Sequence, residues 1–237
     1  MSIRRYAAPG QHLFLTARRE ELLEQTAAAA RKKGAKVDMQ RVDVTDQENM
    51  ARFMAASFAR APLDLVIANA GISGGTHKEG GVEDRDAQDR QVLQTNVEGV
   101  LNTALPVIPL MRQRGQGQIA LMSSLASFRG MPGAAAYCAS KAAVRLYGEA
   151  LREELAPEGI KINVICPGFV KTPMTDINRC AMPFLMEADK AAQIIADGLA
   201  RNKGRISFPW QMALLLWPFY GLPSSWSACL ASTARKG

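Results

Sequence analysis

Three short apolar runs, each followed by small or polar residues, constrain the fold of this chain more than any other feature. Residues 63–68, 119–122 and 160–166 are rich in aliphatic side chains over a length typical of buried parallel strands. Each run would bring the residues after it to the carboxyl edge of a sheet, where ligands bind in open α/β folds. The residues placed there are Asn69-Ala70-Gly71, Ser123-Ser124 and Pro167-Gly168.

Tyr137 and Lys141 are the strongest candidates for chemistry. Positions four apart lie one above the other on a helix, so the Lys141 ammonium would sit beneath the Tyr137 ring. A fixed positive charge lowers the pKa of a phenol from about 10, which would make Tyr137 a useful acid or base at neutral pH. Such pairs are also common on solvated helix faces. The pair gains weight here from Ser124, which lies at the end of the preceding strand.

Taken in order, these residues resemble those of the single-domain, NAD(P)-dependent short-chain dehydrogenases/reductases. The resemblance spans roughly residues 13–208 and rests on Asp43-Val44, Asn69-Ala70-Gly71, Asn96, Ser124, Tyr137-x-x-x-Lys141, Pro167-Gly168 and Thr172. It implies an α/β, Rossmann-type, doubly wound parallel sheet in one domain over residues 1–208. The strands are expected near residues 12–16, 37–42, 63–69, 118–123, 161–166 and 205–208.

The resemblance also implies a reaction, in which a hydride passes between a nicotinamide cofactor and a carbonyl or alcohol substrate. Tyr137 would exchange the hydroxyl proton, while Ser124 would hydrogen-bond the substrate oxygen. Lys141 would lower the pKa of Tyr137 and hold the nicotinamide ribose, and Asn96 would support a proton relay through water. Further cofactor contacts are implied for Asp43, Val44, Asn69, Ala70, Gly71, Pro167, Gly168 and Thr172. Taken as bare residues, Asn96 is a polar helix position and Asp43 helps to open the helix expected over residues 46–60.

Arg18 bears on the choice of cofactor. Enzymes that prefer NAD usually place an acid near this point to hold the ribose 2′-hydroxyl, whereas an arginine accommodates the 2′-phosphate of NADP. Ala17 stands where the acid would fall. We therefore expect NADP(H) as the preferred cofactor and NAD(H) as the second choice. The alternative is that Arg18 is an exposed arginine at a helix start.

The largest departure from the family pattern lies before residues 12–16, where neither a first strand nor a Thr-Gly-x-x-x-Gly-x-Gly turn is found. That turn presents backbone N–H groups to the cofactor pyrophosphate. In the family the missing strand lies between the strands expected at 12–16 and 63–69. We expect the 237-residue chain alone to be poorly soluble or partly unfolded and to bind NADPH weakly. The alternative function is an inactive or truncated relative that acts as a scaffold or a membrane-surface binder.

Composition restricts the partners. With 237 residues, 48% of them hydrophobic, the chain can bury one sizeable core. Its net charge of +7 is scattered without a basic run, so nucleic acid is not expected as a partner. No metal site or secreted disulfide framework is expected, and the N-terminus lacks the apolar segment of a signal peptide. The thiols then belong to a reduced, cytoplasmic protein; they are Cys138, Cys166, Cys180 and Cys229.

Two apolar segments lie near the end of the sequence. Residues 173–186 would form the substrate loop, and its apolar side chains indicate an apolar carbonyl or alcohol, although Met-rich loops are also ordinary packing. These side chains are Met174, Met182, Phe184, Leu185 and Met186. Residues 209–237 form a separate tail that holds all three tryptophans and is uncharged as far as residue 234. We expect it to be a pocket lid or subunit contact, ahead of peripheral membrane contact through 209–234 and of a membrane span, because its prolines break a long helix.

By analogy with the family, the helices of Asn96 and Tyr137 would form a homodimer or homotetramer contact.

Overall fold

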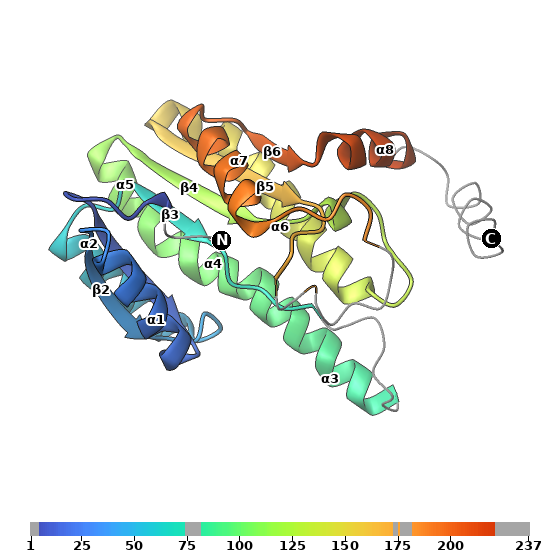
Figure 1. The fold of residues 1–237 in the computed structure, drawn as a ribbon, viewed down its shortest axis with the longest axis horizontal. Helices are drawn as coiled ribbons and strands as arrows, with labels where there is room; N and C mark the ends of the chain where they lie inside the picture. Colours follow the sequence, from blue (N-terminus) through green and yellow to red (C-terminus); the bar gives the residue numbers. More distant parts are fainter. Residues whose placement is uncertain (1–4, 74–81, 173–174, 176–181, 221–237) are drawn as a thin grey trace.

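The computed structural model describes residues 5–73, 82–172, 175 and 182–220, in which strands and helices alternate along the chain (Figure 1). The strands are β1 (His12–Ala17), β2 (Lys36–Arg41), β3 (Leu65–Ala68), β4 (Gly117–Met122), β5 (Ile160–Pro167) and β6 (Arg205–Phe208). The α-helices are α1 (Glu20–Arg31), α2 (Gln47–Arg60), α3 (Val82–Leu93), α4 (Gly99–Ala104), α5 (Ile108–Arg114), α6 (Ala135–Leu155), α7 (Ala188–Ala200) and α8 (Trp210–Tyr220). All six predicted strands are therefore confirmed, with ends that differ by no more than two residues.

Local sequence explains where the first helices begin and end. The turn after α1 passes through Gly34, whose φ of +86° lies in the left-handed region that glycine tolerates best. The N-cap of α2 is Asp46, whose carboxylate accepts a hydrogen bond from the Asn49 amide. The capping role considered for Asp43 is wrong. Its carboxylate instead accepts hydrogen bonds from the amide and hydroxyl of Thr45, which fixes the turn after β2.

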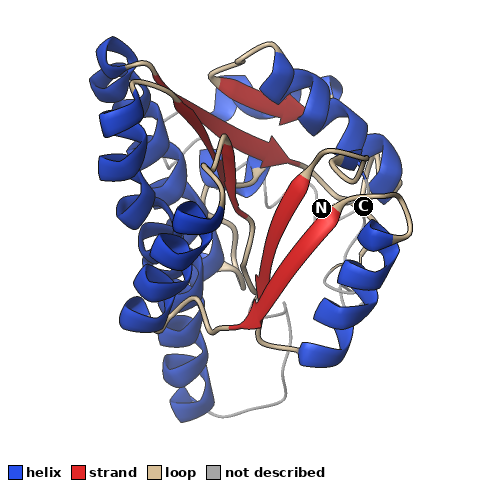
Figure 2. Ribbon diagram, turned by 90° about the vertical axis from the view of Figure 1, so that its left-hand side faces the viewer, coloured by secondary structure: helices blue, strands red, loops and turns tan. Residues whose placement is uncertain are grey.

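The strands form two parallel sheets rather than one. β1 pairs only with β2, whereas β3, β4, β5 and β6 form a four-stranded sheet in that order. Figure 2 shows the two-stranded sheet set apart from the larger one. The Rossmann-type parallel architecture is confirmed, and the sheet is interrupted as the missing first strand predicts.

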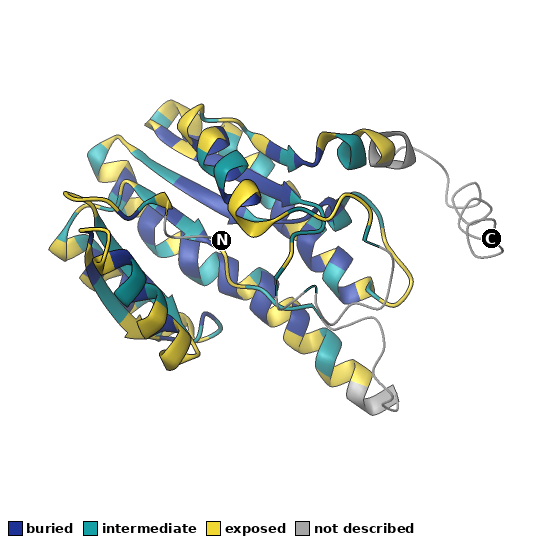
Figure 3. Cartoon of the chain, viewed as in Figure 1, coloured by how far each residue is buried: buried dark blue, intermediate teal, exposed yellow. Residues whose placement is uncertain are grey.

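The core is continuous on one side of the two sheets and divided on the other. One cluster joins Val42 and Val44, which follow β2, to Val66 and Ala68 of β3, with Phe14 of β1 packed against it. On the other side, α1 covers β1 and β2 in one cluster, while α7 covers β4 to β6 in a second. Burial is accordingly deepest around β4 and β5 (Figure 3).

Val44, which follows the two-stranded sheet, contacts helix α4 beside the four-stranded sheet. The Asn102 amide of α4 donates to the Val44 carbonyl at 2.8 Å. A Cβ atom added at Gly99 would lie 2.6 Å from Cγ2 of Val44, so only glycine lets α4 approach so closely. The buried Val44 side chain therefore belongs to the core between the sheets.

The helices after β3 carry Asn96. Helix α3 begins at Val82, and the residues 74–81 before it lie outside the described residues. The helical stretch that follows is interrupted at the π-helical turn η2 (Gln94–Glu98), which contains Asn96. In the tail, α8 is a helix of 11 residues that projects beyond β6 (Figure 1). Among the helices of the described ranges, none has the length and apolar character needed to cross a membrane.

Candidate active site

Helix α6 holds Tyr137 and Lys141 on one face, as their spacing predicts. The Lys141 Nζ atom lies 5.8 Å from the centroid of the half-buried Tyr137 ring. This ammonium is only 4% exposed, and it donates a hydrogen bond of 2.9 Å to the Met122 carbonyl at the end of β4. The pair is thus anchored to the carboxyl end of a central strand.

Burial dominates the pKa values of both groups. It raises the pKa of Tyr137 above its ordinary value of 10.0, and a hydrogen bond with Ser124 lowers that pKa in part. Burial also lowers the pKa of Lys141 from 10.5 to about 8. The expected lowering of the Tyr137 pKa by Lys141 stays a prediction.

Ser124 is the second residue after the end of β4. Its hydroxyl donates to the Pro167 carbonyl at 3.3 Å and accepts from the Ala126 amide at 3.1 Å. The neighbouring Ser123 hydroxyl donates to the Lys141 carbonyl at 2.7 Å, which joins β4 to α6. The ends of β4 and β5 and the first turns of α6 are therefore held together by serine hydroxyls, with Ser124 against Tyr137.

Asn96 is fully buried and connects three segments. Its side-chain oxygen accepts from the Ile72 amide at 2.8 Å, while its Nδ2 donates to the Ile72 carbonyl and to the Ser140 hydroxyl. Ser140 in turn donates to the Tyr137 carbonyl at 2.7 Å. Sequence reasoning missed Ser140, although its place between Tyr137 and Lys141 in the motif is the signal that could have found it.

Gly71 lies beside this network. A Cβ atom there would come within 3.1 Å of the Asn96 side-chain oxygen and 3.2 Å of Lys141 Nζ. The segment 69–71, Asn96, Ser124, Tyr137 and Lys141 are thus brought together at the carboxyl ends of β3, β4 and β5. Asn69 and Ala70 are exposed there.

The remaining predicted cofactor residues lie at the edge of this site. The Pro167 carbonyl accepts from Ser124, and the Gly168 amide donates to the Phe208 carbonyl at 2.7 Å. The Thr172 amide donates to the Thr175 hydroxyl at 2.9 Å, which fixes a turn at the start of the predicted substrate loop. Most of residues 173–181 of that loop, including Met174, lie outside the described residues. Val44 can offer a cofactor only its backbone, because its side chain is buried against Gly99.

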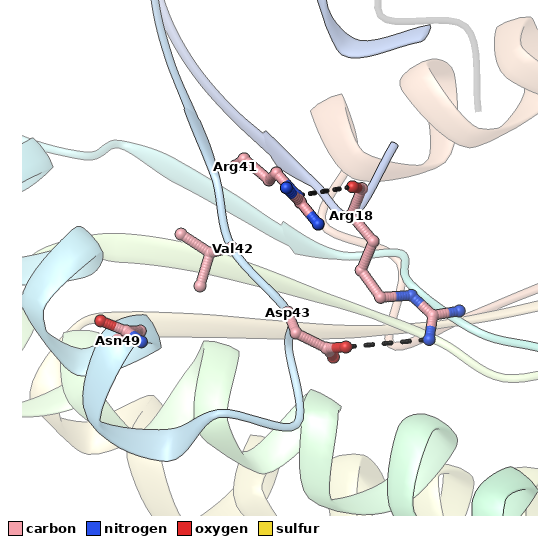
Figure 4. Close-up of a pocket in the computed structure, with 5 residues that line it drawn as sticks. All are labelled: Arg18, Arg41, Val42, Asp43 and Asn49. Carbon is pink, nitrogen blue, oxygen red and sulfur yellow. Dashed lines mark hydrogen bonds and ion pairs between the residues drawn. The ribbon is translucent and has the colours of Figure 1, made fainter. Parts of the chain in front are cut away.

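A second feature is a pocket of about 320 Å³ at the ends of β1 and β2, lined by Arg18, Arg41, Val42, Asp43 and Asn49 (Figure 4). One guanidinium nitrogen of Arg18 lies 3.7 Å from the Asp43 carboxylate. Arg41 Nε donates to the Arg18 carbonyl at 3.1 Å. The structure therefore brings together Arg18 and Asp43, two of the residues predicted to bind the cofactor, and adds Arg41, which sequence reasoning missed.

Both features suit a dinucleotide. Exposed arginines around an open pocket can hold the phosphorylated end of a nucleotide, while the buried polar groups around Tyr137 can act on a carbonyl oxygen. Over the described ranges, no three His, Cys, Asp or Glu side chains gather as a metal site would require.

Comparison with known proteins agrees with this geometry. The family model described as short chain dehydrogenase matches residues 2–181. An uncharacterized oxidoreductase of Myxococcus xanthus is 38% identical over 209 residues, which cover 88% of this chain and 81% of the relative. Cyclopentanol dehydrogenase of Comamonas testosteroni is 36% identical over 170 residues, covering 71% of this chain and 67% of the relative.

Two solved structures share the fold. A short-chain dehydrogenase from Sphingobium yanoikuyae in complex with NADPH has a TM-score of 0.78 and 25% identity, covering 100% of this chain and 88% of its own. Levodione reductase has a TM-score of 0.77 and 25% identity, covering 90% and 92% of the two chains. Because the family model covers residues 2–181 of the 237-residue sequence, the chain belongs to the short-chain dehydrogenase family and is an NAD(P)-dependent oxidoreductase.

Proposed function

We propose that this protein reduces an apolar carbonyl compound with NADPH, using Tyr137 as the proton donor. The observation that carries the proposal is the grouping of the half-buried Tyr137 with the buried Ser124 and Lys141 at the carboxyl ends of the central strands. Lys141 lies 5.8 Å from the centroid of the Tyr137 ring and Ser124 hydrogen-bonds Tyr137, so both can stabilise the tyrosinate that remains when the phenol donates its proton.

The roles of the site residues follow from their positions. Bound NADPH supplies the hydride for the carbonyl carbon, and Tyr137 donates its hydroxyl proton to the carbonyl oxygen. The Ser124 hydroxyl, adjacent to Tyr137, hydrogen-bonds that oxygen and orients the substrate. Lys141, protonated below its pKa of about 8, holds the nicotinamide ribose and stabilises the tyrosinate that remains after proton transfer. Asn96 fixes the backbone at Ile72 and supports return of the proton through water.

The cofactor contacts are proposed on the same basis. Arg18 favours NADPH over NADH by pairing with the 2′-phosphate, and Asp43 with the Val44 backbone lies at the adenine. The remaining contacts fall to residues at the carboxyl edge of the four-stranded sheet: Asn69, Ala70, Gly71, Pro167, Gly168 and Thr172. The NADPH in the Sphingobium structure supports this choice.

The substrate is proposed to be apolar because the described part of its loop is apolar and open. Phe184 and Leu185 are exposed there, and the Met186 amide donates to the Phe169 carbonyl, which joins the end of the loop to the segment after β5. The names cyclopentanol dehydrogenase and levodione reductase support a carbonyl or alcohol as the reacting group.

Replacing Tyr137 by Phe tests the proposal. The variant keeps the ring but loses the proton donor, so NADPH-dependent turnover of a reducible apolar ketone should fall by about two to four orders of magnitude. Tyr147→Phe is the matched control, since Tyr147 lies on the same helix and packs against the core away from the site. Near-normal turnover by the Tyr137→Phe variant would remove Tyr137 from the mechanism.

We propose a homodimer formed through the helices that carry Asn96 and Tyr137, or a homotetramer that contains this dimer. Leu146 on α6 is 53% exposed, and Leu93 and Leu105 on the adjoining helical segment are also exposed. Burial of such side chains against a second copy would favour association. Light scattering should report a dimer or larger for the wild type and a monomer for Leu146→Asp.

We also propose that residues 209–237 form a tail distinct from the dehydrogenase domain over residues 1–208, in a cytoplasmic protein. Met212 and Ala213 pack α8 onto the core beside Gly168, whereas Trp210, Leu214 and Leu215 are exposed. The exposed side of α8 would serve as a lid or subunit contact, or bind a membrane surface. Flotation with anionic liposomes distinguishes membrane binding from the other two roles, because only a membrane-bound protein would float with the liposomes.

A further inference from the structure

Arg41 is the pocket residue to which the proposed function gives no role. It ends β2, and its side chain crosses to the segment after β1, where Nε donates to the Arg18 carbonyl (Figure 4). A guanidinium has five N–H donors, so four remain after this bond. Across the described ranges, no carboxylate forms an ion pair with Arg41. Its position is therefore fixed while its charge stays available to a ligand.

Arg18 is held differently. Its guanidinium lies 3.7 Å from Asp43, and the two side chains are 47% and 39% exposed. Ion pairs as exposed as this contribute about 0–1 kcal/mol, so an arriving anion can compete with Asp43 for Arg18. Two arginines and one carboxylate line the pocket, which leaves it with an excess of positive charge.

We propose that Arg41 is a second residue that recognises the cofactor 2′-phosphate, which binds between the guanidinium groups of Arg18 and Arg41. The proposal rests on the proposed preference for NADPH. A phosphate monoester carries a charge of about −1.5 to −2 at neutral pH and offers three acceptor oxygens, enough for two guanidinium groups. The hydrogen bond from Arg41 Nε to the Arg18 carbonyl places the Arg41 guanidinium beside residue 18, and both arginines line the same pocket.

Binding of 2′-AMP and 5′-AMP to the full chain tests this without any turnover. The two ligands have the same charge and base and differ only in where the phosphate is attached. The wild type should bind 2′-AMP more tightly, and Arg41→Ala should weaken 2′-AMP binding by about 10- to 100-fold while changing 5′-AMP binding by less than about twofold. Arg19→Ala is the control, because it removes the neighbouring arginine, which does not line the pocket.

Each of the other outcomes would contradict the role proposed for Arg41. Equal binding of the two nucleotides by the wild type would overturn both the NADPH preference and the role of Arg41. If only Arg18→Ala removes the preference, the role of Arg41 fails while the preference stands. An Arg19→Ala loss as large as that of Arg41→Ala would show a general charge effect and overturn the proposal. In the Arg18→Ala background, Arg41→Ala should cost further affinity; no further loss would mean that Arg41 only holds the Arg18 backbone, which also contradicts the proposal.

Discussion

The four-stranded part of the molecule and the two-stranded part differ in how completely they are packed. Around β3 to β6, strands such as β5 are buried on both faces, and the polar groups at their ends are paired through Asn96, Ser123 and Ser140. Around β1 and β2, one face joins the common core and the other has its own small cluster. The residues proposed for the chemistry thus lie in the densely packed part, and Arg18 and Arg41, proposed for the 2′-phosphate, lie in the two-stranded part.

Buried hydroxyls without a hydrogen-bond partner occur in both parts of the described structure. Thr16 lies in β1, whereas Thr95 lies in η2 and Ser127 follows β4; the Tyr6 hydroxyl is also unpaired. Tyr6 packs with the cluster under α7, while Ala7 packs with the cluster under α1, so the chain passes from one cluster to the other at these two residues. An unpaired buried hydroxyl costs about 1–3 kcal/mol, so these groups lower the stability of both parts.

The largest predicted effect comes from completing the sheet. Adding a β-strand followed by a Thr-Gly-x-x-x-Gly-x-Gly turn before residue 1 should pair the open strand edges and supply N–H groups for the pyrophosphate. The extended protein should be more soluble and bind NADPH at micromolar concentration, whereas the 237-residue chain should bind it weakly. Calorimetric titration of both proteins measures this, and micromolar binding by the unextended chain would show that other groups hold the phosphates.

The next effect concerns Lys141 in the densely packed part. Below about pH 8 Lys141 is charged in both folded and unfolded chains, and its burial opposes folding. As pH rises from about 8 to 10.5, the folded protein loses this proton first, so stability should rise by up to about 3 kcal/mol from this group. Urea unfolding of wild type and Lys141→Met across this range isolates the contribution. Parallel pH profiles for the two proteins would contradict the lowered pKa of Lys141.

A smaller effect is expected where the two parts meet. Gly99→Ala would place a Cβ atom 2.6 Å from the buried Val44 side chain and push α4 away from the turn after β2. Overpacking of this kind costs about 1–3 kcal/mol, which urea unfolding can measure. Gly130→Ala is the matched control, because no described atom lies within 4 Å of the position its Cβ would take. Equal stability of the two variants would mean that this contact does not hold the parts together.

The strands and the Tyr137/Lys141 pair could be predicted from the sequence, because hydrophobic periodicity and the order of motifs can be recognised without knowledge of tertiary contacts. The break between β1 and β3 was also predictable, since the given sequence does not contain the segment that lies between them in the family pattern. The raised pKa of Tyr137 could not be predicted from the sequence, because it depends on burial by distant segments. Arg41 was missed for the same reason, since only the pairing of β1 with β2 brings it beside Arg18. Asp43 and Asp46 could not be told apart as caps until the first turn of α2 was known.

Native-state hydrogen exchange tests the central claim, that the two-stranded part is held on one face and opens by itself. The amides of β1 and β2 should exchange through an opening at least about 1.4 kcal/mol less costly than that of β4 and β5, which is a tenfold difference in protection. The β4 and β5 amides should exchange only by global unfolding. Equal protection in all four strands would show a single cooperative unit and contradict the account.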